Sequence, residues 1–297
     1  MEFRDKVKED IKSKKPKLSK QSIITYASIL SNLYAHIWSD GKYDMEKFNE
    51  VEPVIAFLKN VESNKRKTIL SALYGITGKK EYRDLMISDI DKYNEKEHKQ
   101  EMSDNQRENW VSKNEITTLS DTLQKTADYL YKKQTVKTMA DLQEIQQNII
   151  LCLLGGMYIP PRRSKDYVDF KIKNINKETD NYIEGNKLVF NSYKTAKFYG
   201  SQTIDLPKEL KAILVKWIKI NPTDYLLFDS KGLQLSNVKL NQRLNKLFEK
   251  KISVNQLRHS YLSDKYQSTI ETNKALARDM EQMGSSRAQE KTYIKTL

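Results

Sequence analysis

Cysteine is nearly absent from this chain of 297 residues, in which Cys152 is the only one. A single thiol cannot form an intrachain disulfide, and the other ligands of a structural zinc site are missing. The sequence therefore predicts a reducing intracellular compartment, either nucleus or cytoplasm. Long apolar runs are also absent, since none approaches the roughly 18 residues of a membrane helix. The opening segment, MEFRDKVKEDIKSKKPKL, has no apolar core of the kind found in secretory signals.

Acidic side chains are in short supply relative to basic ones. Asp and Glu number 39 against 52 Lys and Arg, so the net charge is +13 and the sequence pI is about 9.4. Such an excess attracts polyanions, and nucleic acid is the first partner to consider. A membrane surface is a poorer fit, because the positive charge is spread along the chain instead of lying on one amphipathic helix. A lysine-rich protein without a DNA role also fits the charge alone.

The first hundred residues predict a small helical bundle, because apolar residues recur there at helical spacing. Four helices are expected, over 20–38, 54–61, 65–77 and 80–96. The basic stretch KSKKPK (12–17) is expected to be solvated and disordered. The segment 94–109 has almost no apolar side chains, which indicates a linker or a solvated helix end, and we place the domain boundary there. We therefore expect a helical N-terminal DNA-binding domain over 1–103 and a catalytic domain over 110–297.

The second domain is expected to be mostly helical with one small sheet. Ser112 and Glu115 form a capping-box pattern that opens a helix. Alternating apolar residues on either side of SYKTAKFYG predict a β-hairpin over 187–206. Further helices are expected over 139–158, from Pro207 through KELKAILVKWIKI, and over 236–250, 254–266, 270–283 and 287–295. The predicted fold class is mainly α with a small β-sheet.

Four polar clusters in the second domain are candidates for a site. In PPRRSKDYVDF, Arg163 precedes Asp166 by three residues, so we expect the carboxylate to hold the guanidinium. Lys194 lies in the predicted hairpin, Arg258 and His259 are adjacent in NQLRHSY, and Tyr293 is near the C-terminus.

These side chains are the ones that metal-free phosphoryl transfer through a tyrosine requires. Two guanidiniums can bind the non-bridging oxygens of a phosphodiester. A lysine can protonate the leaving sugar oxygen, and a tyrosine can act as the covalent nucleophile. No acidic cluster of the kind that holds two magnesium ions is present in the sequence, which disfavours a two-metal nuclease. No cofactor is expected.

Four motifs resemble, in their order and spacing, the catalytic motifs of tyrosine recombinases, the phage-integrase superfamily. They are PPRR..D, the hairpin YKT, NQLRHSY and MGSS…TY. The resemblance covers about 110–297 by motif and 18–100 by architecture, and the double proline is most similar to versions from large DNA viruses, virophages and eukaryotic mobile elements. It implies a site-specific recombinase or integrase that forms a 3′-phosphotyrosyl intermediate without metal, as a tetramer on two double-stranded DNA duplexes. The implied catalytic residues are Arg163, Lys194, Arg258, His259 and Tyr293.

Several alternatives stay open on the sequence alone. Arg162 competes with Arg163, and Lys197 could replace Lys194. The family usually has histidine or lysine where this chain has Asn255, and histidine or tryptophan where it has Ser285. These departures remove auxiliary groups and keep a non-catalytic DNA-binding relative under consideration. A type IB topoisomerase-like relaxer would use the same chemistry, and a structural basic protein would use none of it.

Overall fold

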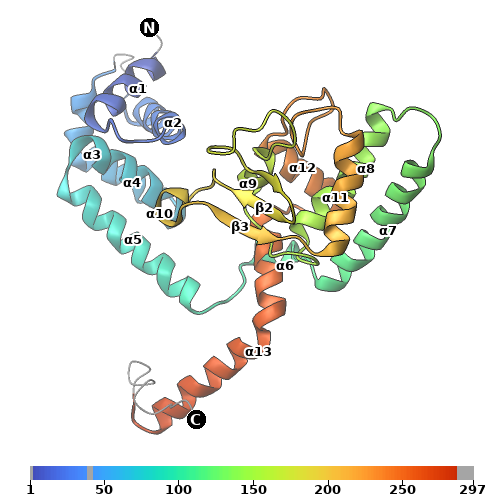
Figure 1. The fold of residues 1–297 in the computed structure, drawn as a ribbon. Coiled ribbons are helices and arrows are strands. Elements are labelled where there is room, and N and C mark those ends of the chain that lie inside the picture. The colour runs from blue at the N-terminus through green and yellow to red at the C-terminus, as the bar shows by residue number, and fades with distance from the viewer. Residues whose placement is uncertain (1–2, 39–42, 286–297) are drawn as a thin grey trace. The chain divides into compact units, whose positions relative to one another are not determined.

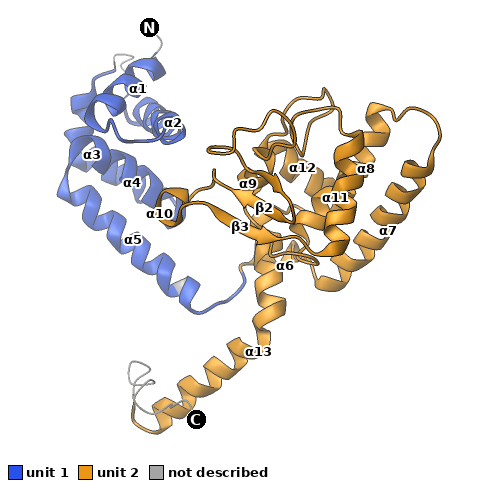
Figure 2. Cartoon of the chain, viewed as in Figure 1, with its two compact units in different colours: residues 1–102 blue, residues 103–297 orange. Residues whose placement is uncertain are grey.

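The computed structural model describes residues 3–38 and 43–285, and it divides the chain into two compact units, Met1–Met102 and Ser103–Leu297 (Figure 2). The division falls within 94–109, where the sequence predicts a linker. The described part is mainly helical with one three-stranded antiparallel sheet (Figure 1). This confirms the predicted fold class at that level.

The first unit consists of helices only within its described part. They are α1 (Phe3–Lys14), α2 (Lys20–Ile37), the 3-10 helix η1 (Met45–Asn49), α3 (Val51–Leu58), α4 (Ser63–Thr77) and α5 (Lys80–His98). The helices expected over 20–38, 65–77 and 80–96 are confirmed by α2, α4 and α5. The helix expected over 54–61 begins and ends three residues earlier, at Val51–Leu58, and Pro53 is tolerated because it lies in the first turn of α3.

The basic start of the chain is more ordered than the sequence predicts. Helix α1 continues to Lys14, because Val7 and Ile11, four positions apart, share one face and are both buried. The prediction of disorder over 12–17 is therefore wrong for 12–14. The side chains of residues 12–17 are nevertheless exposed, so their charges face solvent.

One buried ion pair joins α4 to α5. Arg66 donates from two nitrogens to the two oxygens of Asp89, at 2.8 and 2.5 Å. Asp89 is fully buried, and Arg66 is only 16% exposed in its side chain. The third Arg66 nitrogen, Nη1, faces the carbonyl oxygens of Leu58 and Val61, each at 3.4 Å. Arg66 thereby connects three segments of the bundle.

The second unit has its own hydrophobic core. Its elements are α6 (Asp104–Glu108), α7 (Lys113–Lys132), α8 (Met139–Leu154), α9 (Ser164–Val168), β1 (Tyr182–Glu184), β2 (Lys187–Phe190), α10 (Ala196–Tyr199), β3 (Gln202–Asp205), α11 (Lys208–Ile220), α12 (Asn237–Phe248) and α13 (Val254–Gln282). The predicted capping box is confirmed, since Ser112 and Glu115 exchange side-chain and backbone hydrogen bonds at the start of α7. Helix α8 packs against α7 and α11.

Helix α8 crosses the core and carries the single cysteine. Cys152 is 1% exposed, and burial raises the pKa of its thiol to about 12. The helix ends at Leu154, four residues earlier than the sequence predicts. Gly155 and Gly156 follow, and Gly156 adopts φ +77°, a conformation that does not continue a right-handed helix.

The sheet has the order β1-β2-β3, with both pairs antiparallel. The hairpin expected over 187–206 is confirmed: Lys187 pairs with Asp205, and Phe190 with Gln202. Strand β1 and the short helix α10 inside the hairpin loop were not expected. The loop from Asn191 to Ser201 therefore projects from two fixed strands.

The last described helical segment has a kink where the sequence predicts a break. The sequence predicts two helices, over 254–266 and 270–283. Helix α13 spans Val254–Gln282, and the backbone of Tyr266 is not helical (φ −117°, ψ 19°), so two helices meet there. No glycine or proline lies in this range, and the second helix follows the kink directly, without the expected gap at 267–269. The helix expected over 287–295 lies outside the described residues. No helix in the ranges 3–38 and 43–285 combines the length and the apolar content needed to cross a membrane.

Candidate active site

Two neighbouring arginines follow the double proline after α8, and they have different surroundings. Arg162 faces inward, where its Nε donates to Asp166 Oδ2 at 2.8 Å and a terminal nitrogen donates to Gln202 Oε1 at 3.0 Å. Its guanidinium carbon lies 4.1 Å from the centre of the Phe190 ring. The expectation that Asp166 holds Arg163 is therefore wrong. Arg163 has extended backbone just before α9, so the residue four positions before Asp166 makes the ion pair instead.

Arg163 lines an open groove with a volume of about 550 Å³. We call it the arginine groove. It is lined by Arg163, Ser164, Lys165, Ser192, Tyr193, Lys194 and Asn255. Within the described chain, the Arg163 guanidinium makes no hydrogen bond or ion pair, while Lys165 is 3.8 Å from Asp169. The groove therefore presents cationic side chains that are available to an anion.

Asp166 lies beneath this groove and is 2% exposed. Burial raises the pKa of its carboxyl group, and the charges of Arg162, Arg163 and Arg258 oppose that rise. Its Oδ2 accepts from Arg162, whereas its Oδ1 is buried and has no hydrogen-bond partner among residues 3–38 and 43–285. Because three arginines act on this one carboxylate, the first and second arginine motifs belong to the same small region.

Arg258 reaches this region from the first part of α13. A terminal nitrogen of Arg258 donates to Asn255 Oδ1 at 3.2 Å, and Asn255 lines the arginine groove. Burial lowers the pKa of Arg258, the positive charge of Arg163 lowers it further, and Asp166 raises it. The structure thus brings the two predicted guanidiniums together, although 95 positions separate them in the chain. The site has more positive charge than it balances internally.

His259 follows Arg258 on the exposed side of α13. No hydrogen bond or ion pair of His259 occurs within residues 3–38 and 43–285. The imidazole of His259 is therefore exposed next to Arg258 and is accessible to a ligand.

Lys194 enters the groove from the loop between β2 and β3, where its side chain is exposed. Lys197, the alternative lysine, is not among the groove residues. Its Nζ lies 4.8 Å from the centre of the Phe198 ring. Of the two lysines, the geometry favours Lys194 for contact with a ligand held by Arg163.

Asn181 connects the lysine loop to the segment of the first arginine, a role that the sequence did not reveal. Its fully buried side chain donates to the carbonyl oxygens of Asp166 and Ser192, both at 2.9 Å. Its Oδ1 accepts from the Ser192 backbone nitrogen at 2.8 Å. A buried amide far from either motif has no distinctive spacing, so only the folded chain identifies it.

A close contact between Gly156 and Tyr261 sets the position of α13. An added Cβ at Gly156 would lie 2.4 Å from the Tyr261 ring, so only glycine permits this approach. Tyr261 lies one turn beyond Arg258 on the same helix. The turn after α8 therefore fixes α13, and with it Arg258, against the body of the second unit.

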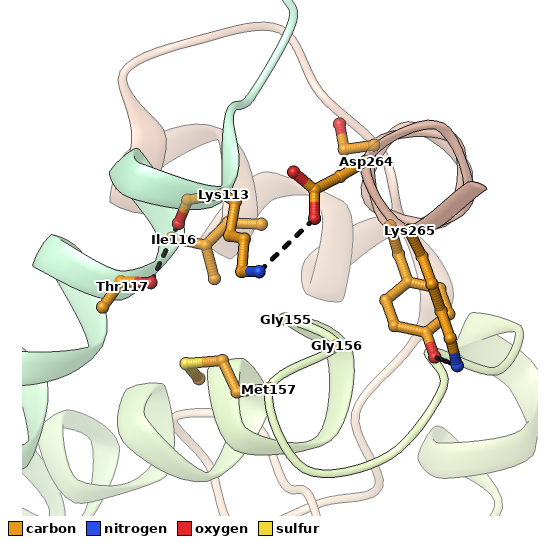
Figure 3. Close-up of a pocket in the computed structure, with 10 residues that line it drawn as sticks. Lys113, Ile116, Thr117, Gly155, Gly156, Met157, Asp264 and Lys265 are labelled. Carbon is orange, nitrogen blue, oxygen red and sulfur yellow. Dashed lines mark hydrogen bonds and ion pairs between the residues drawn. The ribbon is translucent and has the colours of Figure 1, made fainter. Parts of the chain in front are cut away.

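Figure 3 shows a second pocket at this contact, with a volume of about 480 Å³. It lies between α7, the Gly155–Gly156 turn and α13. Lys113 and Asp264 form an ion pair across it at 3.6 Å, and Lys265 donates to the Tyr261 hydroxyl at 3.0 Å. The Lys113–Asp264 ion pair ties α13 to α7, whereas the contact between Lys265 and Tyr261 lies within α13.

The two remaining predicted positions lie at the end of the chain. Tyr293, the predicted nucleophile, lies outside the described residues. Ser285 is the last described residue, and its backbone nitrogen donates to the Met280 carbonyl at 2.8 Å.

No group of three or more His, Cys, Asp or Glu side chains that could hold a metal ion occurs in the part of the chain that the structure describes. Comparison of the chain with models of known protein families finds no matching family, and comparison with curated proteins finds no significant match.

Proposed function

We propose that this protein is a DNA strand-cleaving and rejoining enzyme of the tyrosine-recombinase type, acting on double-stranded DNA through the arginine groove. The convergence of Arg163, Lys194 and Arg258 on one region is the observation that supports it. The buried carboxylate of Asp166 fixes the neighbouring Arg162, and the buried amide of Asn181 fixes the start of the loop that carries Lys194. An isolated basic surface would not need this support. A phosphodiester is an anion that two guanidiniums match, because each can donate two parallel hydrogen bonds.

In the proposed reaction, the scissile phosphate binds between Arg163 and Arg258. Charge develops on the non-bridging oxygens as a fifth oxygen approaches phosphorus, and preorganised donors stabilise this charge more than that of the ground state. Asn255, which accepts from Arg258 in the free protein, can donate to the phosphate from its amide nitrogen. It cannot transfer a proton at neutral pH, so proton transfer falls to other residues.

The chemical step breaks the bond between phosphorus and the 5′ oxygen. The phenol oxygen of Tyr293 attacks phosphorus and forms the 3′-phosphotyrosyl bond, while its proton passes to a base, for which His259 is the candidate. Lys194 gives a proton to the departing 5′ oxygen, which leaves as a hydroxyl. Attack by a 5′-hydroxyl from another strand reverses these steps and releases Tyr293. Exchange between two duplexes requires four protomers, as the resemblance implies.

The experiment that tests this proposal traps the covalent intermediate. The full-length protein is incubated with a pool of nicked duplexes of random sequence, from which the short cleaved strand dissociates. We expect a protein–DNA adduct that survives denaturation and maps to Tyr293 by mass spectrometry. Y293F should give none, and R163A and R258A should each reduce its rate by about 10²–10³.

Matched variants make the result specific. Y129F changes a tyrosine that is 73% exposed on α7, and the adduct should form at the wild-type rate. Absence of any Tyr293-dependent adduct, with sequence-selective binding retained, would contradict the enzyme and favour a DNA-binding relative. Relaxation of supercoiled plasmid without strand exchange between duplexes would favour a topoisomerase-like relaxer instead.

A further inference from the structure

Two aromatic side chains next to the arginine groove are left in solvent. Phe198 is 72% exposed and Tyr199 is 69% exposed, both in α10 within the β2–β3 loop. Ala196, at the start of the same short helix, packs against the core of the second unit. The chain therefore uses one side of this turn for packing and presents its two large rings outward.

The loop that carries these rings is held firmly at its base. The Tyr193 hydroxyl donates to the Gly200 carbonyl at 2.7 Å and closes the loop. Tyr193 is itself 9% exposed, and the Arg162 guanidinium lies 5.0 Å from its ring centre. Ser192, the next residue back, is fixed by Asn181. A loop fixed in this way presents exposed aromatics with little further loss of conformational entropy on binding.

The charges around the rings indicate the partner. Lys194 and Lys197 lie within five residues of Tyr199, both are exposed, and no carboxylate occurs between Asn191 and Ser201. Lysines beside exposed rings match a partner that offers phosphates outside and flat apolar surfaces inside. Duplex DNA has both, because apolar side chains can enter between base steps from the minor groove while lysines contact the flanking phosphates.

We propose that Phe198 and Tyr199 form an aromatic wedge that enters duplex DNA beside the bound phosphate and unstacks a base step there. The inference rests on the proposed function for its DNA partner, and extends it to the deformation of that DNA. Pyrimidine–purine steps such as TA unstack most easily, so the wedge favours sites that carry such a step next to the cleaved phosphate. The unstacked step would also ease the separation of strands that exchange requires.

The test measures unstacking directly. The full-length protein is titrated into an alternating TA duplex with 2-aminopurine in place of some adenines, whose fluorescence rises when the base leaves the stack. Wild type should raise the fluorescence, and F198A and Y199A should reduce that rise. Each should weaken binding roughly 5- to 150-fold, the equivalent of about 1–3 kcal/mol per lost stacking contact. F198W should retain both signals, because it keeps an aromatic ring.

Y129A is the matched control, since it removes an equally exposed ring from α7 and should change neither signal. The wedge would be overturned if F198A and Y199A raised the fluorescence and bound DNA as wild type does. It would also be overturned if these two variants lost binding to anionic vesicles while their DNA binding stayed unchanged. The experiments distinguish a failure of the aromatic wedge from a failure of the proposed catalysis. An adduct on Tyr293 without ring-dependent unstacking defeats the wedge alone, and ring-dependent unstacking without an adduct defeats the catalytic proposal alone.

Discussion

At the scale of single residues, Arg162 and Arg163 show how adjacent, chemically identical side chains take different roles. Arg162 is fixed by Asp166, Gln202 and the Phe190 ring, whereas Arg163 faces the open groove. The first is a structural residue, and the second is free to bind an anion. The sequence left this choice open, because a one-residue step in an extended segment reverses the direction of a side chain.

Alanine substitutions of the two arginines should therefore change the free energy of unfolding by different amounts. R163A should leave the free energy of unfolding within about 0.5 kcal/mol of wild type, because the half-buried Arg163 side chain makes no hydrogen bond or ion pair within the described residues. R162A should lower it by about 3–5 kcal/mol, because Asp166 stays buried without its partner. Chemical denaturation of both variants checks this prediction, and equal losses in the two would contradict it.

The pH dependence of R162A follows from Asp166. Burial already raises the pKa of this carboxyl group in the native protein, so its ionisation above the usual value of about 3.9 disfavours the folded state. Removal of Arg162 strengthens this effect. The deficit of R162A should therefore be largest near neutral pH and should shrink as pH falls and Asp166 takes up a proton. A deficit that does not change with pH would show that lost packing, and not charge, dominates.

Asn181 is the second residue with a clear expected outcome. N181A removes two hydrogen bonds to carbonyl oxygens and leaves the Ser192 nitrogen unpaired, so it should cost about 1–3 kcal/mol of stability. It should also slow adduct formation, because the Lys194 loop loses its support, while the DNA binding that depends on Arg163 should persist. N237A, which removes an exposed amide from α12, is the control. Normal adduct rates in N181A would mean that the loop is positioned by other contacts.

At the scale of elements, helical spacing of apolar residues was sufficient to locate most helices. It failed where the decisive contact is tertiary. The α8 terminus, for example, depends on the conformation of Gly156 against Tyr261. The candidate site residues Arg163, Lys194 and Arg258 could be selected from motifs, but Asn181 and the partner of Asp166 could not, since both depend on side-chain direction in the folded chain.

The Gly156 contact gives a prediction at this scale. G156A should lower the free energy of unfolding by about 1–2 kcal/mol for the left-handed backbone, with a further 1–3 kcal/mol for the clash with Tyr261. Since α13 must move, adduct formation should fall as well. G185A, also at positive φ but with nothing near its Cβ, measures the backbone cost alone. Equal stability of the two variants would show that Tyr261 yields without displacing the helix.

At the scale of the whole molecule, the net charge of +13 should govern DNA affinity. Binding that neutralises six or more phosphates should weaken by about 10³ or more between 50 and 200 mM salt. A plot of log affinity against log salt concentration should be linear, and its slope should become shallower by about one in R163A. Fluorescence anisotropy at several salt concentrations measures this, and a flat plot would exclude a phosphate-dominated interface.

The two compact units also predict two unfolding events, because each has its own core. R66A leaves Asp89 buried without its partner, so it should cost the first unit about 3–5 kcal/mol and lower one transition by roughly 10 °C or more. The other transition should not move. R83A, whose ion pair with Asp84 is exposed, is the control and should shift neither. Movement of both transitions together in calorimetry would mean that the units unfold as one.

The burial of Cys152 has a practical consequence for spectroscopy. Its thiol is buried in the core of the second unit, and burial raises its pKa to about 12. It therefore stays protonated and inaccessible to alkylating dyes at neutral pH. Since no other cysteine exists in the chain, any single cysteine placed on the surface becomes the one reactive handle. A fluorophore or spin label can thus be attached beside Phe198, or close to Tyr293, without first removing the native thiol.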